Sequence, residues 1–332
     1  MENNTCNSVT AKNGTLIAAL AFICLSLSVT YYYNCYMMVT WGPVDKFSVY
    51  AFKSFSKDLD TYTKYMDATW RPRLFANYLA GFVIPFDSDR DLFADRVGIW
   101  SSAWLFLTLC AYIAWDRRRA PYLIFGTFAC LYYAFTIMAD RHIYPWDMPA
   151  LFFYVLLGIA VHRRNAPAVF LIAVIGTGFK ETVALGGLAF LFWEGLPLRR
   201  RVAFALGTLA ACGLLKIGID ILTKNPSIGI TMQFYSDGPL VLDGVKEKGI
   251  LYNLAALTRL YLNHPVFING GTFLIFLCLP VKDREDLTWK AVGVSFLVGN
   301  LFCAVINEYR VFHEMIPVSL WAIQKHFKLF DG

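Results

Sequence analysis

Residues 57–75, KDLDTYTKYMDATWRPRLF, bring acidic and basic side chains close together and could carry chemistry. Asp58 and Asp60 form a DxD pair, whose carboxylates can act as a general base toward a hydroxyl group or help to bind a divalent metal that bridges phosphates. Arg71 and Arg73 follow, and a guanidinium group matches phosphate oxygens with a fork of donors. These residues predict a site for a phosphate ester and leave a metal cofactor open. The alternative is a solvated loop whose acids fall there by chance, because a single DxD is a short motif.

A second group lies in GTGFKET (176–182), where Lys180 and Glu181 interrupt a long apolar stretch. Ionisable residues at such positions in membrane segments usually have a function. We expect Lys180 to reach an anionic head group and Glu181 to orient it. The alternative is a Lys–Glu pair that only closes a hairpin. Gly176 and Gly178 are expected to loosen the turn.

The short segment ADRHIYPWD (139–147) contains Arg141 and His142 beside aromatic residues that suit a membrane interface. Both residues are candidates for substrate binding. The alternative is interfacial anchoring together with a local ion pair.

A fourth group lies in NEYRVFHEMIPVSLW (307–321), which contains Glu308, Arg310, His313 and Glu314. If the stretch is α-helical, Arg310, His313 and Glu314 lie on one face, whereas Glu308 points elsewhere. We expect Arg310 to bind a phosphate and Glu314 to hold its guanidinium group through an i, i+4 pair. The alternative is a structural Arg–Glu pair that locks the last helix.

The elements that must position these residues are apolar. The chain has 332 residues, of which 57% are hydrophobic and 16% charged, and its mean hydropathy is +0.49. Soluble domains contain about 25% charged residues. The composition therefore predicts an all-α polytopic membrane protein, because a soluble protein this apolar would expose too much hydrophobic surface. The net charge of +6 comes from short basic clusters between apolar segments, so it does not indicate nucleic-acid binding.

About ten transmembrane helices are expected, and every second linker between them is rich in arginine or other charged residues. Basic linkers of membrane proteins stay in the cytoplasm, so the alternation predicts that both termini are cytoplasmic. The predicted spans are 15–34, 98–115, 121–138, 148–161, 167–179, 183–195, 202–222, 265–281, 291–306 and 313–324.

The whole chain, 1–332, is expected to form a single membrane domain with two long outer loops. The first loop, 35–97, contains an apolar segment at 74–86 that is too short to span and predicts an interfacial or re-entrant helix. The second loop, 223–264, contains a helical pattern at 249–264 that predicts another interfacial helix.

Four features resemble the GT-C superfamily of integral membrane glycosyltransferases, especially small bacterial members associated with cell-surface polysaccharide. They are a long first outer loop with acids, a short outer turn with YPWDMPAL, a KET hairpin and a late NEYRVFHEMIP. The resemblance implies a GT-C-like fold in the inner (plasma) membrane and a polyprenyl-phosphate sugar as donor. It also implies a catalytic acid in the first loop, a role that falls on Asp58 or Asp60.

The predicted function is the transfer of a sugar from a lipid-linked donor to a hydroxyl group of a glycan or lipid acceptor at the extracytoplasmic face. Membrane lipids are the other expected partners. One alternative is a transporter or flippase for a lipid-linked or anionic substrate, which should place charge near the bilayer midplane and contain broken helices. Others are an O-antigen ligase or polymerase-like enzyme, with Arg259 and His264 as candidates, and a non-catalytic assembly subunit.

Overall fold

The computed structural model describes residues 3–41, 73–83, 90–137, 145–224, 254, 267–303 and 309–328. Within these ranges the chain forms helices and no strands. Two elements, η2 and η3, are 3-10 helices and the others are α-helices. In order they are α1 (Asn3–Trp41), α4 (Leu74–Val83), α5 (Arg90–Trp115), α6 (Ala120–Ile137), α7 (Asp147–His162), α8 (Ala166–Thr177), η2 (Glu181–Phe192), α9 (Leu198–Leu222), α11 (Phe267–Cys278), α12 (Arg284–Cys303), η3 (Tyr309–Met315) and α13 (Ile316–Phe327).

Each of the ten predicted apolar segments overlaps a described helix, and the last one, 313–324, falls on both η3 and α13. Three of the described helical segments, Gly14–Cys35, Asp95–Trp115 and Leu198–Leu222, are long and apolar enough to cross a membrane. Shorter apolar helices, α7 and α8 among them, pack between them. These features fit the predicted all-α membrane protein, while the number of spans and the side on which the termini lie stay predictions.

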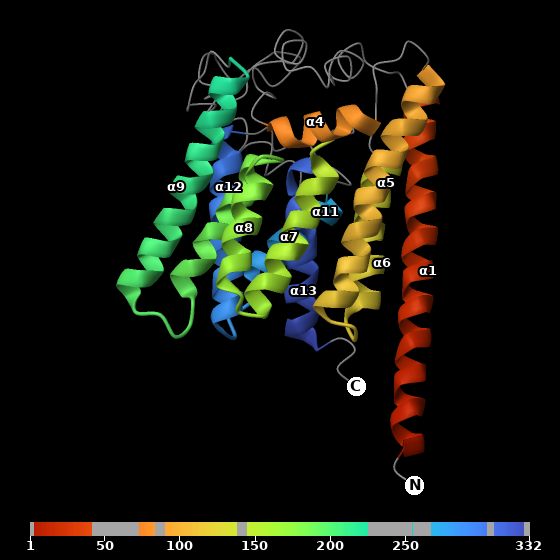
Figure 1. Ribbon diagram of the computed structural model, residues 1–332, viewed down its shortest axis with the longest axis horizontal. Coiled ribbons are helices and arrows are strands. Elements are labelled where there is room, and N and C mark those ends of the chain that lie inside the picture. The colour runs from red at the N-terminus through yellow and green to blue at the C-terminus, as the bar shows by residue number, and fades with distance from the viewer. Residues whose placement is uncertain are drawn as a thin grey trace.

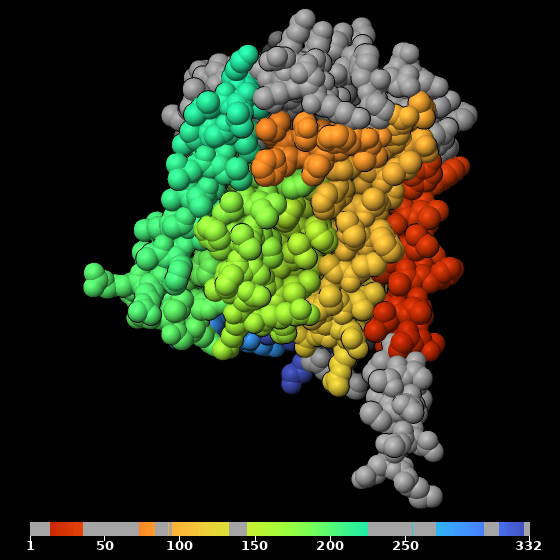
Figure 2. Space-filling model, viewed as in Figure 1, coloured from red at the N-terminus to blue at the C-terminus, as the bar shows by residue number. Residues whose placement is uncertain are grey.

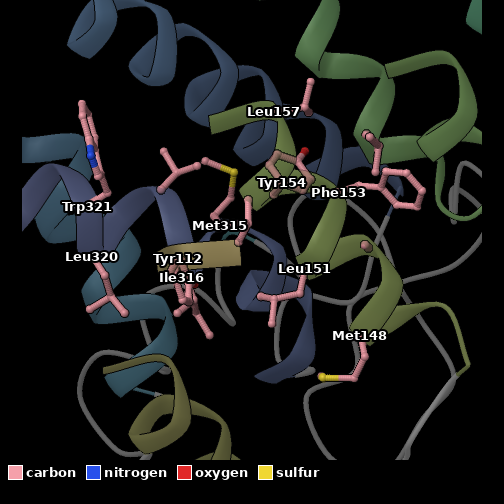
Figure 3. Packing of buried hydrophobic residues seen from close by; sticks show 14 of the residues in the cluster. Tyr112, Met148, Leu151, Phe153, Tyr154, Leu157, Met315, Ile316, Leu320 and Trp321 are labelled. Carbon is pink, nitrogen blue, oxygen red and sulfur yellow. The ribbon is translucent and has the colours of Figure 1, made fainter. Parts of the chain in front are cut away.

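The centre of the bundle is formed by α7 and α13, most of whose side chains are buried. Figure 3 shows Tyr154 of α7 near Met315 and Ile316, where η3 continues into α13. Further along the same core, the rings of Trp115 and Trp321 stack with their centroids 5.7 Å apart. This packing joins the middle of the chain to its last helix, so η3 is held against α7.

The arginine-rich linkers share one end of the bundle, where α1 begins and α13 ends (Figure 1, lower end). Arg163, between α7 and α8, donates to the carbonyl oxygen of Ala114 at 2.7 Å. Lys325 of α13 pairs with Asp283 at 2.5 Å and with Asp286 at 2.7 Å, at the α11–α12 linker. The linkers that were predicted to lie on one side of the membrane therefore meet at one end, and their cytoplasmic location stays a prediction.

Helix α4 lies across the opposite end of the bundle (Figures 1 and 2, orange). The backbone N–H of Phe75 donates to the carbonyl oxygen of Gly178 at 3.1 Å, so α4 is anchored to the turn between α8 and η2. Its outer face exposes Tyr78 and Phe82. The segment expected at 74–86 is thus a helix that ends at Val83 and runs along the end of the bundle; its place at a membrane interface stays a prediction. The segment at 249–264 lies outside the described residues, Leu254 excepted.

Candidate functional site

Three charged side chains from distant parts of the chain meet below α4 in what we term the buried cluster, Asp147, Lys180 and Glu314. The Lys180 Nζ atom lies 3.0 Å from Asp147 Oδ1 and 2.5 Å from Glu314 Oε1. All three residues are buried, Glu314 to 1% exposure. Burying an unpaired charge is very unfavourable, so the lysine and the two carboxylates stabilise one another in this position.

The buried cluster is completed by hydrogen bonds from neighbouring hydroxyl groups. Thr182 donates to Glu314 Oε2, and Tyr154 donates to the backbone carbonyl oxygen of Thr182 at 2.8 Å. Asp147 begins α7, where a negative charge also interacts favourably with the helix dipole. The cluster therefore ties together the start of α7, the α8–η2 turn and η3.

The protonation of Lys180 follows from these contacts. Lys180 lies in the turn between α8 and η2, and its burial by itself lowers its pKa, because burial disfavours the charged ammonium. The negative charges of Asp147 and Glu314 outweigh burial, and the net effect raises the pKa above its ordinary value. Lys180 is thus a permanent cation at neutral pH, which suits an ion pair and does not suit a general base.

A second group of charges, which we term the part-exposed cluster, consists of Arg73, Glu181 and Lys216. Arg73 Nε donates to Glu181 Oε2 at 3.1 Å, and Lys216 Nζ lies 4.0 Å from Glu181 Oε1. The three side chains are 20–30% exposed. The Arg73 guanidinium group also lies over the ring of Trp146, 4.6 Å from its centroid. Two cations from separate elements therefore share one carboxylate at a surface that solutes can reach.

Lys180 and Glu181 are neighbours in sequence but belong to different clusters. The backbone of Lys180 is extended, with φ −155° and ψ 131°, and successive side chains of an extended chain point to opposite sides. Lys180 therefore points toward Glu314, whereas Glu181 points toward Arg73 and Lys216. These contacts differ from both predictions for this pair. Glu181 does not orient Lys180, and the two residues do not pair with each other to close the hairpin.

The two glycines of GTGFKET have a packing role. Gly178 has ordinary helical angles, φ −69° and ψ −19°, so it is not required there for its conformational freedom. A Cβ atom at Gly178 would lie 2.2 Å from the ring of Phe75, and one at Gly176 would lie 2.4 Å from Val183. The glycines let α4 and η2 approach the turn closely, which differs from the predicted loosening of the turn.

Glu314 also differs from its prediction. Its carboxylate contacts Lys180 and Thr182, which come from another part of the chain. Residues 309–315 form a 3-10 helix, in which residues three apart share a face and residues four apart do not. An i, i+4 pair with Arg310 is therefore disfavoured by the backbone, although the Arg310 side chain lies outside the described residues. His313, which directly precedes Glu314 in the sequence, is also buried, at 1% exposure.

The remaining predicted site residues lie outside the described part of the chain, so their positions relative to the two clusters stay predictions. Among the described residues, no group of three histidine, cysteine or acidic side chains could hold a metal ion. Whether the DxD pair binds a divalent metal also stays a prediction. The residues concerned are Asp58, Asp60, Arg71, Arg141, His142 and Glu308.

Asp147 and Lys216 of these clusters, and Thr182 beside them, have no role in the sequence-based prediction. Lys216 lies in the apolar part of α9, well after the arginines at its start, and ionisable residues in such segments usually have a function, so the sequence contains a signal for it. Thr182 follows Glu181 directly, but its hydroxyl contact depends on the fold of η3, and the sequence contains no signal for it.

Comparisons with protein-family models, with curated proteins and with solved structures found no match. Function must therefore be argued from the clusters themselves.

Proposed function

We propose that this protein is a membrane glycosyltransferase that transfers a sugar from a polyprenyl-phosphate donor to an acceptor hydroxyl group at the extracytoplasmic membrane face. The observation that carries the proposal is the part-exposed cluster, in which Arg73 and Lys216 converge from separate elements on Glu181. Cations in this arrangement can bind a phosphate group and stabilise the charge that develops when the phosphate leaves the sugar.

The place of the part-exposed cluster suits an amphipathic donor. Arg73 lies directly before α4, which crosses the end of the bundle and exposes Tyr78 and Phe82. A lipid phosphate needs cations for its head group and an apolar surface for its chain, and both are present within this short segment. The acceptor hydroxyl group needs a general base, a role that we assign to Asp58 or Asp60 in the first outer loop.

The test is an assay of the purified protein in lipid nanodiscs with a panel of polyprenyl-phosphate sugars and candidate acceptors, in which release of the free lipid phosphate is measured. We expect at least one donor to turn over, and we expect Asp58→Asn or Asp60→Asn to slow turnover about 100- to 10,000-fold, as loss of a general base does. Glu194→Gln, at the opposite end of the bundle, serves as a control. Full activity of the double Asp58→Asn, Asp60→Asn variant would contradict the assigned base, and lack of turnover with every donor would contradict the proposed activity.

A further inference from the structure

Glu181 occupies a special position in the part-exposed cluster, because it is the shared partner of both cations. Arg73 reaches it at 3.1 Å and Lys216 at 4.0 Å, from opposite parts of the chain. The two cations and one carboxylate sum to a charge of +1. The positive charges of Arg73 and Lys216 attract an anion to this site, and the negative charge of Glu181 weakens that attraction.

The two cations do not depend on Glu181 alone for their positions. The Arg73 guanidinium group lies over the ring of Trp146, and stacking of this kind holds arginine in place and adds favourable cation–π energy. Trp146 is itself buried, at 3% exposure, and lies next to Pro145, whose carbonyl oxygen accepts a hydrogen bond from Trp100 at 2.9 Å. Lys216 lies on α9. Both cations would therefore stay near the site if the Glu181 side chain moved away.

The backbone around Glu181 is fixed independently of its side chain. Lys180 before it and Thr182 after it both bind Glu314, and Tyr154 donates to the Thr182 carbonyl oxygen. The side chain of Glu181 is 30% exposed. A rotation of this side chain would thus leave the buried cluster and the turn unchanged.

From these contacts we infer that Glu181 is an internal competitor for the anion site, and that a phosphate ester binds by taking over its contacts with Arg73 and Lys216. This inference rests on the proposed function for the identity of the ligand as a lipid-linked phosphate. Glu181 partly neutralises the two cations while the site contains no ligand. The lipid phosphate monoester that the reaction releases has a charge of up to −2 and matches the two cations once the carboxylate has moved away, whereas the donor is a phosphodiester with a charge of −1.

The test compares binding of a polyprenyl monophosphate and of inorganic phosphate to the purified protein in detergent micelles by calorimetry. For Glu181→Gln we expect about fivefold tighter binding or more, because the ligand no longer has to separate a carboxylate from a cation about 4 Å away, even in the weakest case of a water-like dielectric. Glu181→Ala provides a second neutral variant. The matched control is Glu194→Gln, because Glu194 also lies between two cations, Arg164 and Arg284, but at the opposite end of the bundle.

The sign of the change decides the inference. Tighter binding by both Glu181 variants supports it. If their affinity for inorganic phosphate also increases, bare phosphate is the group recognised. If only their affinity for the polyprenyl ligand increases, the lipid-linked form is recognised. Unchanged or weaker binding means that Glu181 holds Arg73 in place and overturns the inference. If the wild-type protein binds the lipid phosphate, and Arg73→Gln weakens that binding, the proposed function survives such a failure. If no variant binds either ligand, both proposals fail.

Discussion

Replacement of Lys180 by methionine tests whether the buried cluster holds the fold together. The Lys180 Nζ atom lies 3.0 Å from Asp147 and 2.5 Å from Glu314, and methionine has a similar length but no charge. At an effective dielectric constant of about 20, Coulomb's law gives roughly 5 kcal/mol for one such pair, against which the desolvation of both groups must be set. Removal of one partner of a buried ion pair costs about 3–5 kcal/mol, because the other charge stays buried without compensation.

Lys180→Met leaves two buried carboxylates, so we expect it to lower the free energy of unfolding by at least about 3–5 kcal/mol. That is a large part of the roughly 5–15 kcal/mol available to a typical protein. The measurement is an SDS titration in mixed micelles, followed by circular dichroism of the helices. Addition of Asp147→Asn and Glu314→Gln should recover most of the loss, because the uncompensated charges are then gone.

The matched control is Lys325→Met at the opposite end of the bundle. Lys325 also pairs with two carboxylates, Asp283 at 2.5 Å and Asp286 at 2.7 Å, but Asp283 is 48% exposed. The pair with the exposed Asp283 contributes about 0–1 kcal/mol. Only the pair with Asp286, whose side chain is 11% exposed, leaves a buried carboxylate behind, so the control should lose less stability than Lys180→Met, which leaves two. If Lys180→Met unfolds like the wild-type protein but no longer releases lipid phosphate, Lys180 is a ligand-binding residue and the structural role argued here is wrong.

Three further predictions address other parts of the molecule. Gly178→Ala should lower the free energy of unfolding by about 1–3 kcal/mol, measured by the same titration, because its Cβ atom would lie 2.2 Å from the Phe75 ring; an unchanged stability would refute the close contact. Burial raises the pKa of Asp283, but the hydrogen bonds from Lys325 and from the backbone of Asp286 and Glu285, together with the Lys325 charge, outweigh it and lower the pKa below its ordinary value. This pair should therefore stabilise the protein by less than about 1 kcal/mol above pH 4, and the stabilisation should disappear as the pH falls further. The measurement is the free energy of unfolding against pH, and an identical profile for Asp283→Asn would contradict the prediction. Arg310→Lys should reduce lipid-phosphate release roughly 100-fold with an unchanged melting temperature, because lysine lacks the bidentate fork; lower stability with unchanged activity would point to a structural lock.

The sequence predicts the helices well, because apolar stretches alternate with charged linkers that mark where the stretches begin and end. The prediction that the arginine-rich linkers lie together is also reflected in contacts such as that of Arg163 with Ala114. Periodicity and charge are local properties, and they determine which segments are helical and which linkers belong to the same side. They contain no information on which charged residues from different helices meet.

The partners of Lys180 illustrate the difference. Its sequence neighbour Glu181 is the obvious candidate, but the extended backbone at Lys180 turns the two side chains to opposite sides. The actual partners, Asp147 and Glu314, lie 33 residues before it and more than 130 residues after it in the chain. Which of these pairings forms depends on the packing of α7 against η3, and that packing follows from the shapes of buried apolar side chains rather than from charge patterns.

The two clusters also bear on the choice between an enzyme and a transporter. A transporter must move segments around its site, and its charges are expected near the bilayer midplane on broken helices. Here the buried cluster joins the start of α7, the α8–η2 turn and η3 through Lys180, and such a connection opposes relative movement of those segments. The part-exposed cluster lies next to α4 at the end of the bundle, with Arg73 directly before that helix. Under the proposed function, the buried cluster would keep the backbone next to the part-exposed cluster fixed, so that a lipid phosphate is held in place for chemistry, because catalysis gains from preorganised charges.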